Sequence, residues 1–269
     1  MGLISLEENH QRKHRRYRIR WCALLAFAFP WTAWTQDGSG GSPDVPILPK
    51  PEAIAPNAGL KQPGVQWKPL LNQSLRFLVF ENAYRYATEP GTRDPNRPYF
   101  RGYLDAVGSL HGWADGDPFY VNYVGHPMQG AVTGRIFINN SDKARRQEFG
   151  KQGHYWESRV KTMAWSALWS LQFELGPISE TSIGNVGKTR AGDGRSKQTY
   201  GDIVVTPLVG TGLVVLEDMV DKYVLDHWLE QRFTNSLMIK ITRSLLTPST
   251  SFGNILRGRA PWRRDYRFN

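Results

Sequence analysis

Asn122-Tyr-Val-Gly-His-Pro-Met-Gln-Gly130 is the stretch that decides how this chain of 269 residues is expected to fold. It lies within an apolar run, residues 119–139, in which Arg135 is the only charged side chain apart from the histidine itself. Glycines surround the histidine, and small residues at this density allow two helices to approach closely. Pro127 removes a backbone hydrogen bond next to His126. The stretch therefore predicts a buried helix that is kinked near its histidine.

Apolar periodicity predicts further helices on both sides of this run. Pro and Gly mark the connections between them. The expected helices are residues 67–87, 99–110, 119–139, 156–175, 202–229 and 236–246. The expected fold class is mainly α, a helical bundle whose apolar helices are kinked and contain Gly and Pro. None of these segments is an uninterrupted apolar span of about 20 residues. We therefore expect a domain that is soluble or lies against a membrane, rather than a polytopic one.

The first 35 residues have the pattern of a secretory signal peptide. Six basic residues between Arg12 and Arg20 precede an uncharged apolar run from Trp21 to Trp34, which is short for a bilayer span. Ala33-Trp-Thr35 offers a cleavage site of the small-x-small type. The alternative is a retained N-terminal anchor, and in both cases we expect a periplasmic or outer-membrane-associated protein. The single cysteine, Cys22, lies in this segment, so a cleaved chain would carry no disulfide and no thiolate site.

The rest of the chain divides by composition into three parts. Residues 36–66 are rich in Pro, Gly and Ser, which is typical of an extended linker. Residues 67–247 carry the predicted helices and suit one domain. Residues 248–269 form a tail in which arginines alternate with aromatic residues. Loss of the signal peptide would lower the formal net charge from +10 to about +6, and the tail holds much of the basic charge that remains.

The tail and the aromatic content indicate contact with a membrane. The basic and aromatic tail residues are Arg257, Arg259, Arg263, Arg264 and Arg267, among Trp262, Tyr266 and Phe268. This pattern can bind nucleic acid, but nucleic acid is not an expected partner of an exported protein. Anionic lipid head groups or an envelope protein are the expected partners, and a solvated, poorly ordered tail is the alternative. The 10 Trp and 11 Tyr residues are typical of proteins at a membrane–water boundary, although a large aromatic core would also use them.

Polar residues that interrupt the apolar helices are the candidate functional residues. Besides His126 they are Glu157, Glu174 and Asp202. If these four converge, a histidine beside carboxylates could act in general acid and base catalysis. His126, Glu174 and Asp202 are also weak candidates for a divalent metal site of one histidine and two carboxylates, and no other cofactor is predicted. A buried network that fixes helix register, or that shapes a ligand pocket without catalysis, explains the same pattern.

The order of these motifs resembles an uncharacterised bacterial envelope family with an Asn-Tyr-x-x-His-Pro-x-x-Gly signature. The matching residues are Asn122 to Gly130, Trp156-Glu-Ser158, Glu174 with the nearby Pro-Ile-Ser179, and Gly201-Asp202-x-x-x-Thr206-Pro207-x-x-Gly210. The order His, Glu, Asp is more distantly similar to VanZ-like helical proteins. The resemblance covers about residues 119–217 and implies export, often with outer-membrane association, but no reaction. One departure is a Gly/Lys/Arg-rich insertion between Ser179 and Asp202, where the family has almost no spacer.

Two functions remain open at this point. The first is a non-catalytic, membrane-associated envelope protein in which His126, Glu174 and Asp202 form a structural or ligand-shaping cluster. The alternative is a membrane-surface hydrolase or transferase that acts on lipid or cell-wall substrates with the same residues. Access to water separates the two, because catalytic residues must open onto a cleft, whereas a structural cluster is dry and paired.

Overall fold

A computed structural model describes residues 64–93, 99–100, 102–108, 110, 112–113, 119–150, 153–184, 186 and 200–265. The predicted signal peptide, residues 1–35, and nearly all of the predicted linker, residues 36–66, lie outside the described residues. The described residues belong to one unit, Gly59–Asn269. This unit is mainly helical, and its helices pack together, which confirms the predicted helical bundle.

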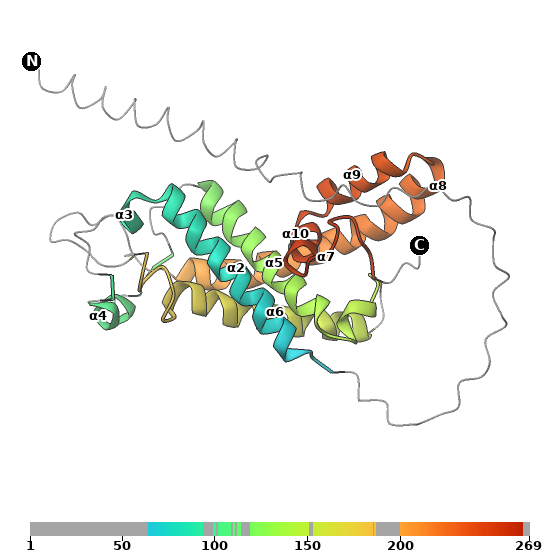
Figure 1. Cartoon of the computed structure of the whole chain (residues 1–269). Coiled ribbons are helices and arrows are strands. Elements are labelled where there is room, and N and C mark those ends of the chain that lie inside the picture. The colour runs from blue at the N-terminus through green and yellow to red at the C-terminus, as the bar shows by residue number, and fades with distance from the viewer. Residues whose placement is uncertain are drawn as a thin grey trace, which may run out of the picture. The chain divides into compact units, whose positions relative to one another are not determined.

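The helices follow one another along the chain as Figure 1 labels them. They are α2 (Trp67–Thr88), α3 (Pro90–Arg93), α4 (Tyr103–Gly108), η2 (Val121–Gly125), α5 (His126–Asn139), η3 (Ala144–Arg146), α6 (Gly153–Leu175), α7 (Tyr200–Met219), η4 (Val220–Leu229), α8 (Glu230–Arg232), α9 (Ser236–Leu246) and α10 (Pro248–Leu256). The sequence predicts α2, α6 and α9 closely. The helix expected over residues 99–110 is shorter, because only Tyr103–Gly108 is helical.

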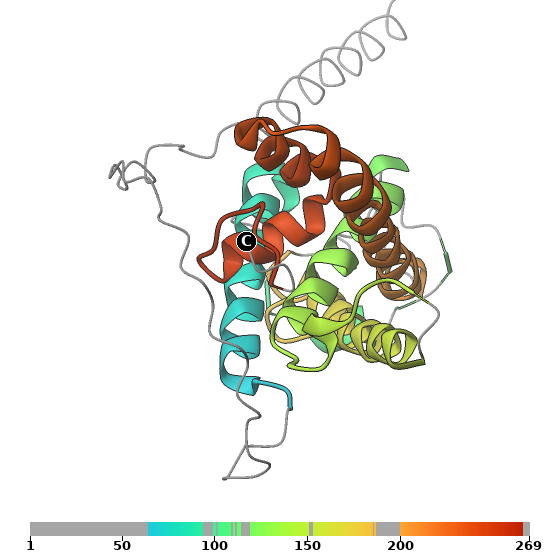
Figure 2. The same cartoon turned by 90° about the vertical axis from the view of Figure 1, so that its right-hand side faces the viewer.

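Helix α5 is the centre of the unit, and it packs against α7, α6, α10 and α2 (Figures 1 and 2). Its closest neighbour is α7. A β-carbon built on Gly130 would lie 1.9 Å from the backbone oxygen of Thr206, and one on Gly210 would lie 2.6 Å from the backbone carbon of Gly130. The two backbones therefore touch where both helices have glycine, which confirms the close approach that the small residues predict.

The irregularity expected beside Pro127 takes the form of a π-helix. Residues Val121–Gly125 are wound as π-helix η2, and the backbone N–H of His126 donates to the carbonyl oxygen of Val121. Pro127 has no N–H to offer the preceding turn, so the backbone cannot keep a regular α-helical ladder through this point. The wider π turn absorbs the missing bond and leads into α5 with helical dihedral angles.

Helices α7, η4 and α8 form one continuous helix, Tyr200–Arg232. In the described part of the chain it is the one helix that is long and apolar enough to cross a membrane, and 28% of its most apolar window is buried. Core helices of soluble proteins share these properties. The sequence predicts this helix over residues 202–229, and the structure extends it by two residues at its start and three at its end.

The hydrophobic core lies between α2, α5, α6 and α10. Its buried members are Leu70, Phe77, Leu78, Val132, Ile136, Phe137, Trp169, Phe173 and Leu256. Many other large apolar side chains remain exposed on α2, α6, α7, η4 and α9, whereas α5 has none. Large exposed apolar areas are unusual on a monomeric soluble protein and mark surfaces that meet a partner or a membrane.

The alternative of a solvated, poorly ordered tail over residues 248–269 is wrong for residues 248–265, the part that the structure describes. Residues 248–256 form α10, which contributes Leu256 to the core. The carboxylate of Glu217 caps this helix by accepting hydrogen bonds from the backbone N–H groups of Ser249 at 2.7 Å and Thr250 at 3.0 Å. Arg264 folds back and pairs with Asp221 at 2.8 Å, with both side chains buried. Glu217 and Asp221, which precede this segment in the chain, thus hold it against the bundle.

Candidate functional site

His126 lies between two carboxylates from neighbouring helices, and we call these three residues the histidine cluster. Nδ1 of His126 is 3.8 Å from Oε1 of Glu174 on α6, and Nε2 is 3.5 Å from Oδ1 of Asp202 on α7. Oγ1 of Thr206 lies 3.4 Å from the same Nδ1. His126, Glu174 and Asp202 are 6%, 2% and 7% exposed. The predicted convergence of these three side chains is confirmed.

Small residues and hydroxyl groups hold the cluster together. The glycine contact between α5 and α7 brings the first turns of α7, with Asp202 and Thr206, against the start of α5. The hydroxyl of Ser170 on α6 donates to the backbone oxygen of Asp202 at 3.3 Å, and that of Thr181 donates to the backbone oxygen of Glu174 at 2.7 Å. The interior around the cluster is therefore polar but hydrogen-bonded, as buried polar groups require.

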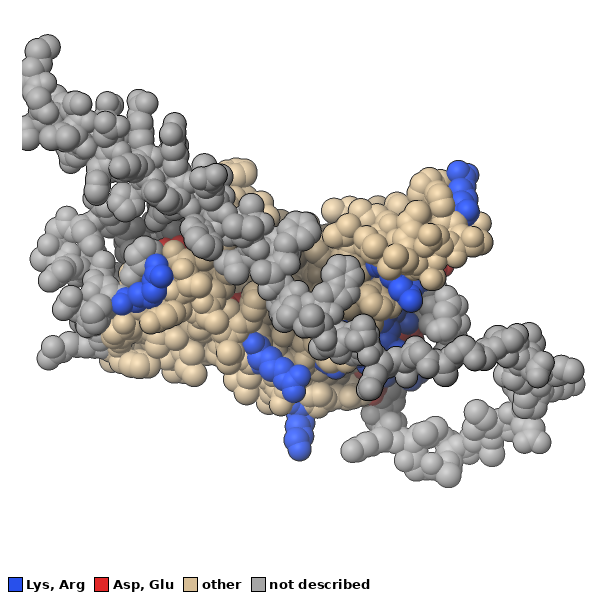
Figure 3. All heavy atoms as spheres, turned by 45° about the horizontal axis from the view of Figure 1, so that its top comes forward, with Lys and Arg blue, Asp and Glu red and all other residues tan. Residues whose placement is uncertain are grey.

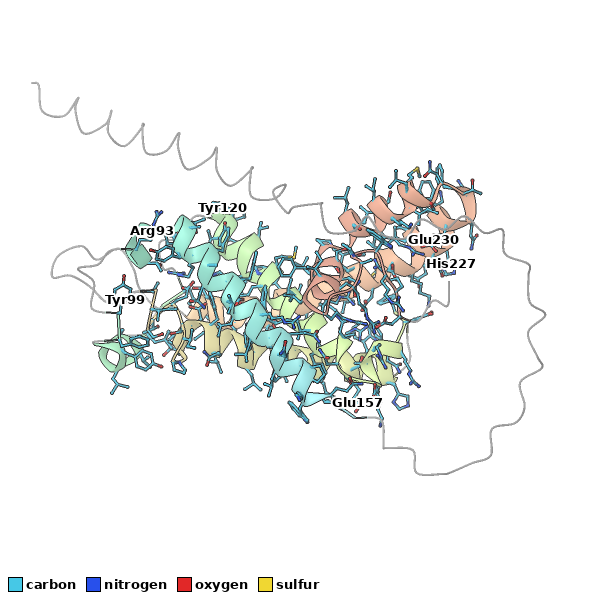
Figure 4. The ribbon with its side chains drawn as sticks, viewed as in Figure 1. Arg93, Tyr99, Tyr120, Glu157, His227 and Glu230 are labelled. Carbon is cyan, nitrogen blue, oxygen red and sulfur yellow. The ribbon has the colours of Figure 1, made fainter. Side chains whose placement is uncertain are left out.

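Glu157, the fourth candidate, does not join the cluster. It pairs with Lys161 one turn along α6, and its Oε2 lies 3.7 Å from Nδ1 of His154. Its side chain is 57% exposed, and the Lys161 ammonium lowers its pKa. Glu157 and Glu174 stand near opposite ends of α6, about 25 Å apart at the rise of an α-helix. Figure 4 shows Glu157 at the opposite end of the bundle from Tyr120, the residue before η2.

The three side chains of the cluster are almost fully buried among the described residues. They do not line either of the pockets formed around Asp218 and Asp221. Within the part of the chain that the structure describes, no group of three or more His, Cys, Asp or Glu side chains is arranged to hold a metal ion. Burial of this degree is what a structural cluster requires, since its groups find their partners within the protein.

Replacing His126 by alanine is expected to lower the free energy of unfolding by about 2 kcal/mol, since two buried carboxylates lose their shared partner and a cavity opens. Glu174→Gln is expected to lower it by a smaller amount, because the amide keeps the shape of the carboxyl group. Denaturant unfolding of both variants measures these changes. Unchanged stability in both would contradict the structural role.

Glu81 is a second buried carboxyl group, on α2 facing α5 and α6. Its Oε2 accepts a hydrogen bond from Nε1 of Trp169 at 3.3 Å. Burial raises the pKa of Glu81 to about 8, although hydrogen bonds from Gln129 and Trp169 act against the rise. Glu81 is therefore protonated and neutral in the folded protein at pH 7, because burial disfavours the charged carboxylate.

The protonated Glu81 makes stability depend on pH. The folded state keeps its proton between about pH 4.5 and pH 8, whereas the unfolded state releases it above the ordinary pKa of 4.5. Stability is therefore lost as the pH rises through this window, by about 2–3 kcal/mol between pH 6 and pH 8. Glu81→Gln, which imitates the neutral acid, is expected to flatten the curve. Thermal unfolding of wild type and variant at both pH values tests this, and parallel curves would refute it.

Sequence reasoning missed a third buried group, which we call the Asp218 network. The carboxylate of Asp218 on α7 accepts hydrogen bonds from Nη1 of Arg135 at 2.8 Å, from the hydroxyl of Tyr155 at 2.8 Å and from Nε of Arg159 at 2.9 Å. Nη2 of Arg135 also donates to the backbone oxygen of Val214 at 3.0 Å. The network ties the second half of α5 to the start of α6 and the end of α7.

Burial and charge compete in the Asp218 network, and charge decides the ionisation states. Burial acts to raise the pKa of Asp218, but Arg135 and Arg159 outweigh it and lower the pKa. Burial likewise acts to lower the pKa of Arg135, but Asp218 and Glu217 raise it. Both groups stay ionised. The sequence signal was present, because Arg135 is a lone charge in an apolar helix and acidic residues end the apolar run of α7.

Comparison of the chain with family models, with curated proteins and with solved structures gave no match.

Proposed function

We propose that this chain is a non-catalytic protein of the bacterial cell envelope that lies on a membrane surface, and that the histidine cluster fixes the packing of its helices. One observation carries the proposal, an uncovered apolar surface on α9 and η4 that we call the α9 face. The location in the envelope rests on the signal-peptide pattern of residues 1–35.

The α9 face consists of large apolar side chains that point out of the bundle. Leu237, Ile241 and Leu245 are 62%, 44% and 69% exposed, and their spacing of four places them on one side of α9. No residue of α9 is buried. On the adjoining η4, Tyr223 and Trp228 are 52% and 45% exposed. Aliphatic and aromatic side chains in this arrangement match the boundary between lipid head groups and acyl chains.

The charges around the α9 face are mainly basic, which suits anionic lipid. Lys240 flanks the stripe on α9, and the guanidinium of Arg232 stacks over the Trp228 ring at 5.7 Å. Arg243 pairs with Glu230 at 2.7 Å. Long basic side chains of this kind can keep their charge among head groups while their stems cover apolar surface. Figure 3 shows a mostly uncharged surface, with Lys and Arg near the α8–α9 end and little acidic surface.

The histidine cluster supports the non-catalytic part of the proposal. A catalytic set on a lipid or glycan would have to reach the substrate, whereas His126, Glu174 and Asp202 are buried among three helices. A buried polar network can select one register of packing, because a shifted helix would leave its groups without partners. The cluster therefore suits a scaffold that holds the α9 face rigid.

The α9 face is tested by substituting Ile241→Glu and Leu245→Glu together and measuring co-sedimentation with vesicles of phosphatidylcholine and phosphatidylglycerol. The substitutions are expected to weaken vesicle binding at least tenfold, because burial of each aliphatic side chain contributes about 1.5–3 kcal/mol. Leu75→Glu on α2, where the leucine is 57% exposed, is the matched control and should leave binding unchanged.

The same variants distinguish lipid from other occupants of the α9 face. A wild-type chain that does not bind vesicles, yet forms a dimer that the α9 substitutions disrupt, would show that a second copy covers this face. Equal loss of vesicle binding in the Leu75 control would place the membrane contact elsewhere. Either result would overturn the assignment to α9.

A further inference from the structure

A basic pocket lies between α5, η3, α10 and the segment that follows α10. It is a shallow hollow open to solvent on one side, with about 40 Å³ of space for water-sized groups. Its charged lining residues are Arg135, Arg145, Arg257, Arg263 and Arg264, with Asp218, Asp221 and Asp265. Five guanidinium groups thus face three carboxylates. We call this site the arginine pocket.

The positive charge concentrates around Asp265. This one carboxylate is 2.5 Å from Nη2 of Arg257, 2.6 Å from Nη1 of Arg259 and 3.6 Å from Nε of Arg263. Burial and the neighbouring Arg259 act to lower the pKa of Arg257, and its pKa lies below the ordinary value although Asp265 opposes this. Guanidinium groups crowded in this way repel one another, and a further anion among them would relieve the repulsion.

The pocket also contains guanidinium N–H groups that can donate hydrogen bonds to the oxygens of an anion. Nε of Arg135, a side chain that is 6% exposed, is buried and has no hydrogen-bond partner among the described residues. At the mouth, the side chain of Arg263 is 60% exposed, and that of Arg145 is 27% exposed and uses only Nη2 in its pair with Asp142, at 3.0 Å. Planar guanidinium groups recognise phosphate and carboxylate oxygens with paired hydrogen bonds.

The segment that carries Arg263 contacts α9 next to the α9 face. Nζ of Lys240 on α9 lies 5.6 Å from the centre of the Trp262 ring, and Trp262 immediately precedes Arg263. An anionic group at the level of lipid head groups could therefore reach the pocket while the apolar stripe of α9 meets the acyl chains.

We propose that the arginine pocket binds a phosphate group, held by Arg145, Arg257 and Arg263. This inference rests on the proposed membrane-surface function for the source of the phosphate, a phospholipid head group, but the same chemistry would bind free phosphate. Arg264 serves a different purpose, because its donors are used by Asp221, by Oγ1 of Thr247 and by backbone oxygens.

The test uses the full chain and two probes, inorganic phosphate and vesicles that contain phosphatidic acid. Isothermal titration with phosphate, against chloride at equal ionic strength, is expected to show saturable binding. Arg145→Gln combined with Arg263→Gln should weaken it at least tenfold, since both variants lose charge-assisted hydrogen bonds to the phosphate. Arg146→Gln, which removes an exposed charge next to Arg145 outside the pocket lining, should change it less than about twofold.

The outcomes separate the pocket from the membrane proposal. Phosphate binding that is absent in wild type, or equal in the pocket variant and the Arg146 control, overturns the arginine pocket. Vesicle binding that depends on Ile241 and Leu245 but not on the pocket residues would leave the α9 face intact and refute the head-group site. Variant-sensitive phosphate binding without vesicle binding would support the pocket with free phosphate as its ligand. Arg263→Gln alone alters only an exposed side chain, so it reports on binding even if the double variant folds poorly.

Discussion

Gly130→Ala is expected to destabilise the folded protein by about 3 kcal/mol or more, which corresponds to roughly 6–12 °C in the unfolding temperature of a domain of this size. The added β-carbon would lie 1.9 Å from the backbone oxygen of Thr206 and 2.7 Å from its carbonyl carbon. These are main-chain atoms, so no side chain can rotate away, and α5 and α7 must separate. Separation would also pull Thr206 and Asp202 away from His126. The higher helix propensity of alanine, about 1 kcal/mol, offsets only part of the cost.

Gly212→Ala is the matched control, because Gly212 lies in the same helix as Gly210. A β-carbon there meets nothing within 4 Å. The control is therefore expected to be neutral or to stabilise the protein by up to about 1 kcal/mol. Thermal and denaturant unfolding of both variants give the comparison. Equal effects at the two glycines would mean that the α5–α7 contact does not limit stability.

Asp218→Asn is expected to destabilise the protein by about 3–5 kcal/mol, the usual cost of removing one member of a buried ion pair. The asparagine keeps the shape of the aspartate but leaves Arg135 and Arg159 facing a neutral amide. Arg159 is 2% exposed and Arg135 is 6% exposed, so water cannot replace the lost charge. The free energy of unfolding from urea titration measures the effect.

The exposed pair of Glu157 and Lys161 provides the control for Asp218. Glu157→Gln removes a carboxylate from the surface of α6 and is expected to change stability by less than about 1 kcal/mol, because solvent screens such pairs. High salt should reduce the small loss of unfolding free energy caused by Glu157→Gln. It should leave the loss caused by Asp218→Asn nearly unchanged. A loss at Asp218 no larger than that at Glu157 would show that the network is dispensable.

The sequence predicted the parts of the fold that depend on local patterns. Apolar periodicity located α2, α6 and α9, and the glycines of residues 119–139 predicted the close helix contact. It missed α10, because Pro248-Ser-Thr-Ser-Phe-Gly has little helix propensity of its own. That helix depends on a cap from Glu217, a residue distant in sequence, and no local rule can supply such a partner.

Of the four candidate residues, the sequence predicted three that do meet in the fold and one that does not. His126, Glu174 and Asp202 each interrupt an apolar helix, so burial forces them to find polar partners, and they find one another. Glu157 is also a carboxylate on an apolar helix, but it lies on the side of α6 that faces solvent. The apolar periodicity near the start of α6 is too weak to predict which side of the helix is exposed. The Asp218 network could not be predicted in the same way, because Arg135, Tyr155 and Asp218 lie on three different helices and only their packing brings them together.

The C-terminal segment packs back onto η4, so some contacts of the bundle can form only after the last residues of the chain have been made. Asp221 is 4% exposed, and its ion pair comes from Arg264, which is made long after the helix that carries Asp221. A ribosome delivers the chain from its N-terminus, so α2, α5, α6 and α7 are made before Arg264. The buried ion pair of Asp221 and the Glu217 cap of α10 can therefore form only after residues 248–264 have been released.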